Sequence, residues 1–117
     1  MKEKVNILGS EWTIKLVKDD ELSKYPALID YEGFTDRSIR TIVVDNSDTN
    51  SNKAQKDITV HRNKVLRHEI IHAFLIESGI DDCYHTDKWG HDEIMVDWIA
   101  IQFPKIEKVF KELNICN

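Results

Sequence analysis

Two histidines and a glutamate form the most chemically suggestive pattern in this chain. His68 and His72 stand four positions apart, and Glu69 directly follows the first of them. On an α-helix, residues at this spacing lie one above the other, so both imidazoles can reach one metal ion while the glutamate projects beside it. Imidazoles are common zinc ligands, and a neighbouring carboxylate can serve as the base that activates water. The pattern therefore predicts a hydrolytic zinc site.

The segment around the motif supports this interpretation over a chance match. A shuffled chain of the same composition would contain the pattern about 2% of the time. Here it lies within residues 64–79, whose apolar side chains recur every three or four positions and which end in Gly79, a residue suited to a helix stop. Burying two histidines and a glutamate on this helix without a partner would cost several kcal/mol, which metal coordination would relieve.

A catalytic zinc ion usually has three protein ligands, so one more ligand is expected from elsewhere in the chain. A second helical pattern begins near Gly90 and has Glu93 near its start, with Asp97 four residues later on the same face. Glu93 is the expected third ligand, and Asp97 can accept a hydrogen bond from the free ring nitrogen of a liganding histidine. His91 and His85 remain alternatives for the third ligand.

The complete spacing resembles that of the gluzincin zinc metallopeptidases, in which HExxH is followed, about twenty residues later, by a glutamate and then an aspartate. Here it reads His68-Glu69-Ile70-Ile71-His72, twenty intervening residues, and Glu93-Ile94-Met95-Val96-Asp97. Over residues 64–104 the chain is also similar to short single-domain zinc peptidases of bacteria, phages and mobile elements. The resemblance implies one zinc ion per chain, bound by His68, His72 and Glu93. It also implies Glu69 as catalytic base and Asp97 as a residue that contacts a zinc ligand instead of the ion.

Peptide hydrolysis also needs a donor to the negatively charged oxygen of the tetrahedral intermediate. His91 is the predicted catalytic residue for this task, with Tyr84 and His85 as alternatives. A peptide substrate can bind as an added strand at a sheet edge, for which Ser38 to Val44 is a candidate. Ile42 and Val44 are equally consistent with an internal strand of the core.

The first half of the chain has the pattern of strands. Residues 5–8 and 12–17 alternate apolar and polar side chains around Gly9-Ser10-Glu11, which is typical of a β-hairpin. Ser38 to Val44 predicts a third strand, after the turn-rich residues 31–36. The polar stretch 45–56 is expected to be a loop.

Helical patterns fill the second half. The motif helix is expected to start near Asp57, and in the second helix Pro104 either introduces a kink or begins a final helix, Lys105 to Leu113. The sequence therefore predicts an α+β fold, with a small antiparallel sheet followed by the HExxH helix and a second ligand-bearing helix. This is a minimal zincin-like arrangement.

Length and composition limit the remaining possibilities. A chain of 117 residues is expected to form one domain, residues 1–117. Acidic residues outnumber basic ones by 21 to 16 and the basic ones are scattered, which argues against nucleic acid as a partner. No apolar run approaches the roughly 20 residues that span a membrane, and no export signal is recognisable. Cys83 and Cys116 form no disulfide framework, so a cytoplasmic location is expected.

These observations predict a zinc metallopeptidase that hydrolyses a protein or peptide substrate through zinc-bound water, with Glu69 as general base. The alternative is a non-catalytic regulatory or interaction module of phage or mobile-element origin, stabilised by zinc, in which Glu69 would have no role. A metal-dependent hydrolase of another substrate class is also consistent with the motif.

Overall fold

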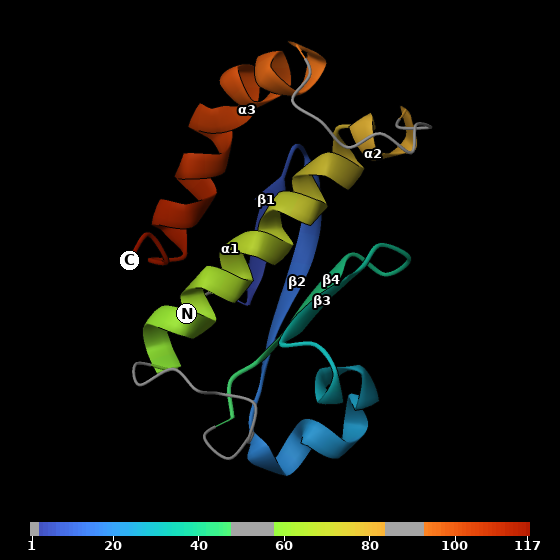
Figure 1. The fold of residues 1–117 in the computed structure, drawn as a ribbon, viewed down its shortest axis with the longest axis vertical. Coiled ribbons are helices and arrows are strands. Elements are labelled where there is room, and N and C mark those ends of the chain that lie inside the picture. The colour runs from blue at the N-terminus through green and yellow to red at the C-terminus, as the bar shows by residue number, and fades with distance from the viewer. Residues whose placement is uncertain (1–2, 48–57, 84–92) are drawn as a thin grey trace.

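A computed structural model describes residues 3–47, 58–83 and 93–117 of the chain. Figure 1 shows a four-stranded sheet with the long helices on one of its faces. In chain order the elements are β1 Lys4–Ile7, β2 Ser10–Val17, the 3-10 helices η1 Asp19–Lys24 and η2 Pro26–Ile29, β3 Gly33–Asp36, β4 Thr41–Asp45, α1 Ile58–Glu77, α2 Ile80–Cys83 and α3 Glu93–Glu112. The predicted α+β class is confirmed.

The sheet has the strand order β1-β2-β4-β3 and is mixed rather than antiparallel throughout. The predicted hairpin of β1 and β2 is present, and β3 and β4 are also antiparallel. The central strands β2 and β4 are parallel, with Ile14 opposite Ile42. A parallel neighbour requires a long crossover, and here the chain makes it through η1, η2 and β3.

The strand predicted at Ser38 to Val44 is shorter and lies elsewhere in the sheet. β4 begins only at Thr41, because residues before it form the turn from β3, in which Arg40 has a φ of 47°. All of β4 is buried, and β2 and β3 flank it. The prediction that this segment is a sheet edge is therefore wrong. Ile42 and Val44 belong to an internal strand, and β3 forms the edge.

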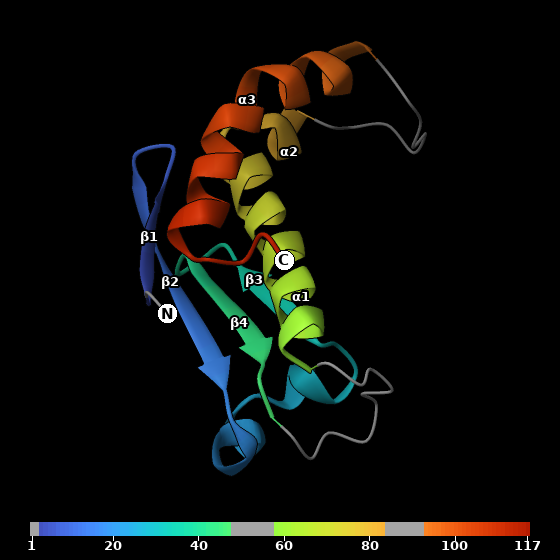
Figure 2. The same ribbon diagram turned by 90° about the vertical axis from the view of Figure 1, so that its left-hand side faces the viewer.

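The core lies between the sheet and the helices (Figure 2). Leu66, Ile70 and Phe74 repeat at intervals of four along α1, and all are at most 1% exposed. They pack in one cluster with Ile42 and Val44 of the sheet. Each such buried side chain contributes about 1.5–3 kcal/mol. This apolar face fixes the rotation of α1 and thereby decides where its polar side chains point.

The C-terminal end of α1 has a clear local cause, and α3 follows it as one continuous helix. α1 ends at Glu77, and Gly79 follows with a φ of 82°, as its predicted stop requires. α3 continues through Pro104 as one helix. It runs back along α1 in the opposite direction (Figures 1 and 2). None of the helices in the described ranges is long and apolar enough to cross a membrane.

The chain after α3 folds back onto α1. Ile115 is fully buried in the main core, and the Arg67 guanidinium donates hydrogen bonds to the backbone oxygens of Ile115 and Asn117. Arg67 therefore joins α1 to the C-terminal segment, and we assign it this structural role.

Candidate metal centre

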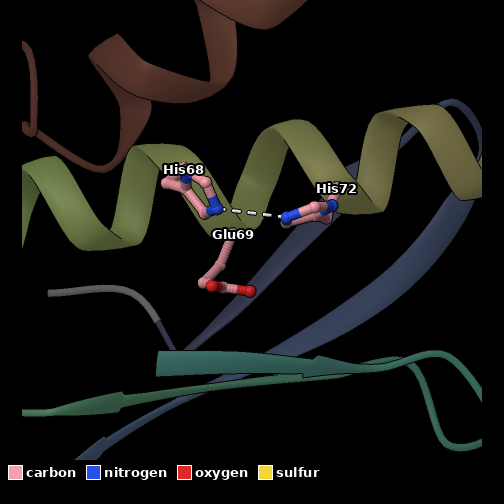
Figure 3. Close-up of side chains that lie close together, drawn as sticks. All are labelled: His68, Glu69 and His72. Atoms are coloured by element: carbon pink, nitrogen blue, oxygen red, sulfur yellow. Dashed lines mark hydrogen bonds between the residues drawn. The ribbon is translucent and has the colours of Figure 1, made fainter. Parts of the chain in front are cut away.

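His68 and His72 lie one turn apart near the middle of α1, and a ring nitrogen of each points toward the other (Figure 3). The two rings meet edge-on, with an angle of 72° between their planes. Their Nε2 atoms are 3.1 Å apart, which allows one ring to donate a hydrogen bond to the other. Two nitrogens bound to a tetrahedral zinc ion at about 2.0–2.1 Å are about 3.3 Å apart. The spacing of the two imidazoles therefore fits two ligands of one zinc ion with little movement.

Glu69 points from α1 toward β3, beneath the two rings (Figure 3). Its Oε2 accepts a hydrogen bond of 2.7 Å from the Thr35 hydroxyl. A carboxylate oxygen of Glu69 and one ring nitrogen from each histidine lie within 4.8 Å of one another. This places the carboxylate beside the position that an ion would take, where it can act on a bound water molecule.

The three side chains differ in burial, so the predicted cost of burying all three applies only to Glu69. His68 and His72 are exposed, whereas Glu69 is 6% exposed. The apolar face of α1 explains the difference, because Ile70 and Leu66 turn the glutamate toward the sheet and the histidines outward. The cost of removing a polar group from water therefore falls on Glu69 alone, and the hydrogen bond from Thr35 reduces it.

A pocket of about 460 Å³ lies in front of these residues. At its rim the Arg37 guanidinium donates a 3.1 Å hydrogen bond to Asp81, which links the turn after β3 to α2. The pocket is lined by Tyr31, Gly33, Phe34, Thr35, Arg37, His68, Glu69, His72, Ile76 and Asp81. The site thus combines two imidazoles with the spacing of metal ligands, a buried carboxylate beside them and an open pocket.

Gly33 and Thr35 are site residues that sequence reasoning missed. A Cβ atom on Gly33 would lie 2.9 Å from Val65 Cγ1 and 3.3 Å from Glu69 Cγ, so glycine lets β3 approach α1 closely. Turn-forming residues on both sides hid this strand, and the one available signal was a glycine next to an aromatic residue. The contact of Thr35 with Glu69 spans 34 positions and leaves no local signal.

The predicted partners from the second half of the chain stand as follows. Glu93 is the first residue of α3, and Asp97 lies one turn later in the same helix. The start of α3 lies beyond the C-terminal end of α1 (Figure 1). His91, Tyr84 and His85 lie outside the described residues.

Comparisons of the chain with protein-family models, with curated proteins and with solved structures find no match. What the site does is therefore inferred from its own residues and their spacing.

Proposed function

We propose that this protein is a zinc metallopeptidase that hydrolyses peptide bonds of a protein or peptide substrate. The observation that carries the proposal is the pair of imidazole Nε2 atoms 3.1 Å apart with a buried carboxylate beside them. Two imidazoles suit zinc, and Glu69 is buried beside them with a hydrogen bond from Thr35. The adjoining pocket gives a substrate access to all three groups.

His68 and His72 hold the ion in this proposal, with Glu93 as the third ligand and Asp97 restraining a liganding histidine. A zinc ion held by these residues would polarise a carbonyl group and make a water molecule more acidic. Glu69 takes the proton of the attacking water and passes it to the leaving amine. His91 donates a hydrogen bond to the oxygen that becomes negatively charged, with Tyr84 and His85 as alternatives.

The edge of β3 is the proposed place where an extended peptide binds. In the part of the chain that the structure describes, β3 has a strand partner on one side only. The Asp45 amide donates to the Glu32 carbonyl, so by alternation the backbone groups of Gly33 and Thr35 point to the open side. A peptide that pairs with these groups runs past the metal-binding face.

A cytoplasmic location is part of the proposal. It is supported by the cysteine pattern, because Cys83 and Cys116 do not form the repeated spacing of a disulfide framework.

Metal content tests the ligand set. Native protein, His72→Ala, Glu93→Ala and His91→Ala are purified without added metal and their zinc is measured by elemental analysis. We expect about one zinc per chain in the native protein and in His91→Ala, and strong loss in the other two variants. Loss in His91→Ala with retention in Glu93→Ala would move the third ligand. Native protein without zinc, even after reconstitution, would contradict the proposal.

Glu69→Gln tests catalysis, because glutamine keeps an oxygen that can accept the Thr35 hydrogen bond but cannot act as a base. Hydrolysis is measured on a randomised mixture of quenched fluorescent peptides. We expect the variant to keep its zinc and to lose activity by about 100-fold or more. Equal activity would contradict the assigned mechanism. Zinc without hydrolysis in the native protein would favour the non-catalytic zinc-stabilised module.

A further inference from the structure

We propose that Thr35 is a positioning residue for Glu69 and that Oε1 of Glu69 is the atom that accepts the proton. This inference rests on the proposed peptidase function and assigns a task to a residue of the sheet edge. It follows from three features of the structure, which are the hydrogen bond, the packing of β3 against β4 and α1, and the direction of the Thr35 backbone.

The hydrogen bond distinguishes the two oxygens of the Glu69 carboxylate. Thr35 Oγ1 lies 2.7 Å from Glu69 Oε2 and 3.2 Å from the Glu69 backbone oxygen. A hydroxyl has a single proton, and the shorter contact to a charged acceptor is the stronger one. Oε2 therefore accepts the hydrogen bond from the hydroxyl. Oε1 has no hydrogen-bond partner among the described residues, so both of its lone pairs are available to a water molecule.

The hydroxyl is held in place by its strand. Thr35 pairs with Ile42 of the buried strand β4, and Gly33 on the same face brings β3 against α1. A β-branched side chain also has few rotamers. A carboxylate at the end of a flexible side chain would otherwise rotate, and small misplacements of a reacting group can cost about 100-fold in rate. Thr35 restricts that rotation.

Thr35 also joins the base to the proposed substrate edge. Its side chain faces α1, whereas its backbone groups point to the open side of β3. One residue therefore contacts the base and, in the proposed complex, the peptide backbone. In the proposed complex, this arrangement sets the position of the scissile bond along β3 relative to the Glu69 carboxylate.

The experiment compares Thr35→Val, which has a similar shape and no hydroxyl, with Thr35→Ser, which keeps the hydroxyl. Thr41→Val is the matched control, because Thr41 lies on β4 and its hydroxyl contacts the Ile39 carbonyl instead of Glu69. The first readout is the carboxyl ¹³C resonance of Glu69 in zinc-loaded protein, assigned through its loss in Glu69→Gln. We expect it to shift in Thr35→Val and to keep its native position in the other two variants.

The second readout is steady-state kinetics on one peptide chosen from the randomised mixture. We expect kcat to fall by about tenfold or more in Thr35→Val with KM within about threefold, and Thr35→Ser to restore most of it. Competition with a chromophoric chelator, with zinc alone as the probe, should give similar affinities for all variants. If Thr35→Val does not fold, Thr35→Ala takes its place in both readouts.

The outcomes separate this inference from the function on which it rests. An active native enzyme with the same resonance and kcat in Thr35→Val would overturn the role of Thr35 alone. A native protein that binds zinc but cleaves no peptide would overturn the peptidase function, and the catalytic part of this inference with it, even if the resonance shifts as expected.

Discussion

Glu69 illustrates how one buried carboxylate depends on two small residues of the facing strand. Thr35 supplies its hydrogen bond, and Gly33 supplies the space in which its side chain lies. Both face α1 because they are two positions apart on β3. Strand and helix must approach closely here, since a longer gap would leave the carboxylate buried without its donor, at a cost of about 1–3 kcal/mol.

A methyl group at position 33 should disturb this approach. In Gly33→Ala the new Cβ lies 2.9 Å from Val65 Cγ1 and 3.2 Å from the Val43 carbonyl oxygen, so one partner must move. We expect the free energy of unfolding to fall by about 1–3 kcal/mol in urea titrations. In a Val65→Ala background the same change should cost less, because the nearest clash is gone. Strictly additive effects would show that Val65 is not the obstacle.

At the level of single residues, the sequence predicts that the two histidines lie together but not which residues surround them. The spacing of His68 and His72 on a helix brings their rings together whatever surrounds them, and the structure has this contact. Their exposure and the partner of Glu69 depend on how α1 is rotated and on the register of β3. Both follow from packing between segments far apart in the chain, which local patterns do not encode.

Among the elements, α1 is tied at its C-terminal end by Glu77. The carboxylate accepts hydrogen bonds from Trp12 Nε1 at 2.9 Å, from Ser10 Oγ at 3.1 Å and from the Arg40 guanidinium. Burial raises the pKa of Glu77, but the hydrogen bonds from Arg40, Trp12 and Ser10 outweigh it and leave the pKa below its ordinary value of 4.5. The end of the site helix is thereby joined to β2 and to the turn before β4.

Glu77→Gln should therefore destabilise the protein in a pH-dependent way. At pH 7 we expect a loss of about 1–3 kcal/mol in urea unfolding, because buried Trp12 and the Arg40 guanidinium lose a charged acceptor. A lowered native pKa means that the ionised group adds stability above its unfolded pKa, and that this stability disappears as pH falls through the native pKa. The difference between variant and native protein should thus shrink below pH about 4.5.

The control for this experiment is Glu107→Gln. Glu107 pairs with Lys111 on the surface of α3, and such an exposed pair is worth about 0.5 kcal/mol or less. A Glu77→Gln penalty that stays constant from pH 7 to strongly acidic pH would contradict the role given to its charge.

The elements differ in how far the sequence predicts them. The apolar repeat and Gly79 predict α1 well, because its face is buried against a continuous core. β3 escaped prediction because Gly33 and Thr35, its residues facing α1, meet the Glu69 side chain instead of filling an apolar layer. The parallel pairing of β2 with β4 depends on the path of residues 18–40, which carry no helical repeat that would indicate a crossover.

In the whole molecule, the face of α1 that carries His68 and His72 lies outside the core. α1 packs against the sheet on one side and α3 on another, and the two imidazoles are exposed. The core clusters of the described residues contain neither histidine. Folding should therefore not require zinc, although zinc bound to the native state should stabilise it through mass action.

His72→Asn separates these two contributions. Without metal, we expect its stability to stay within about 0.5 kcal/mol of the native protein, because an exposed side chain is replaced. In native protein, free zinc at 100 times its dissociation constant should add about 2.7 kcal/mol, and the variant should lose most of this increment. Thermal unfolding in zinc buffers and in chelator measures both.

His61→Asn is the control, since His61 pairs with Glu32 and its replacement should leave the zinc-dependent gain in stability intact. If metal-free His72→Asn were unfolded, the His72 side chain would be needed for folding itself. If zinc stabilised the variant as much as the native protein, His72 would not be a zinc ligand.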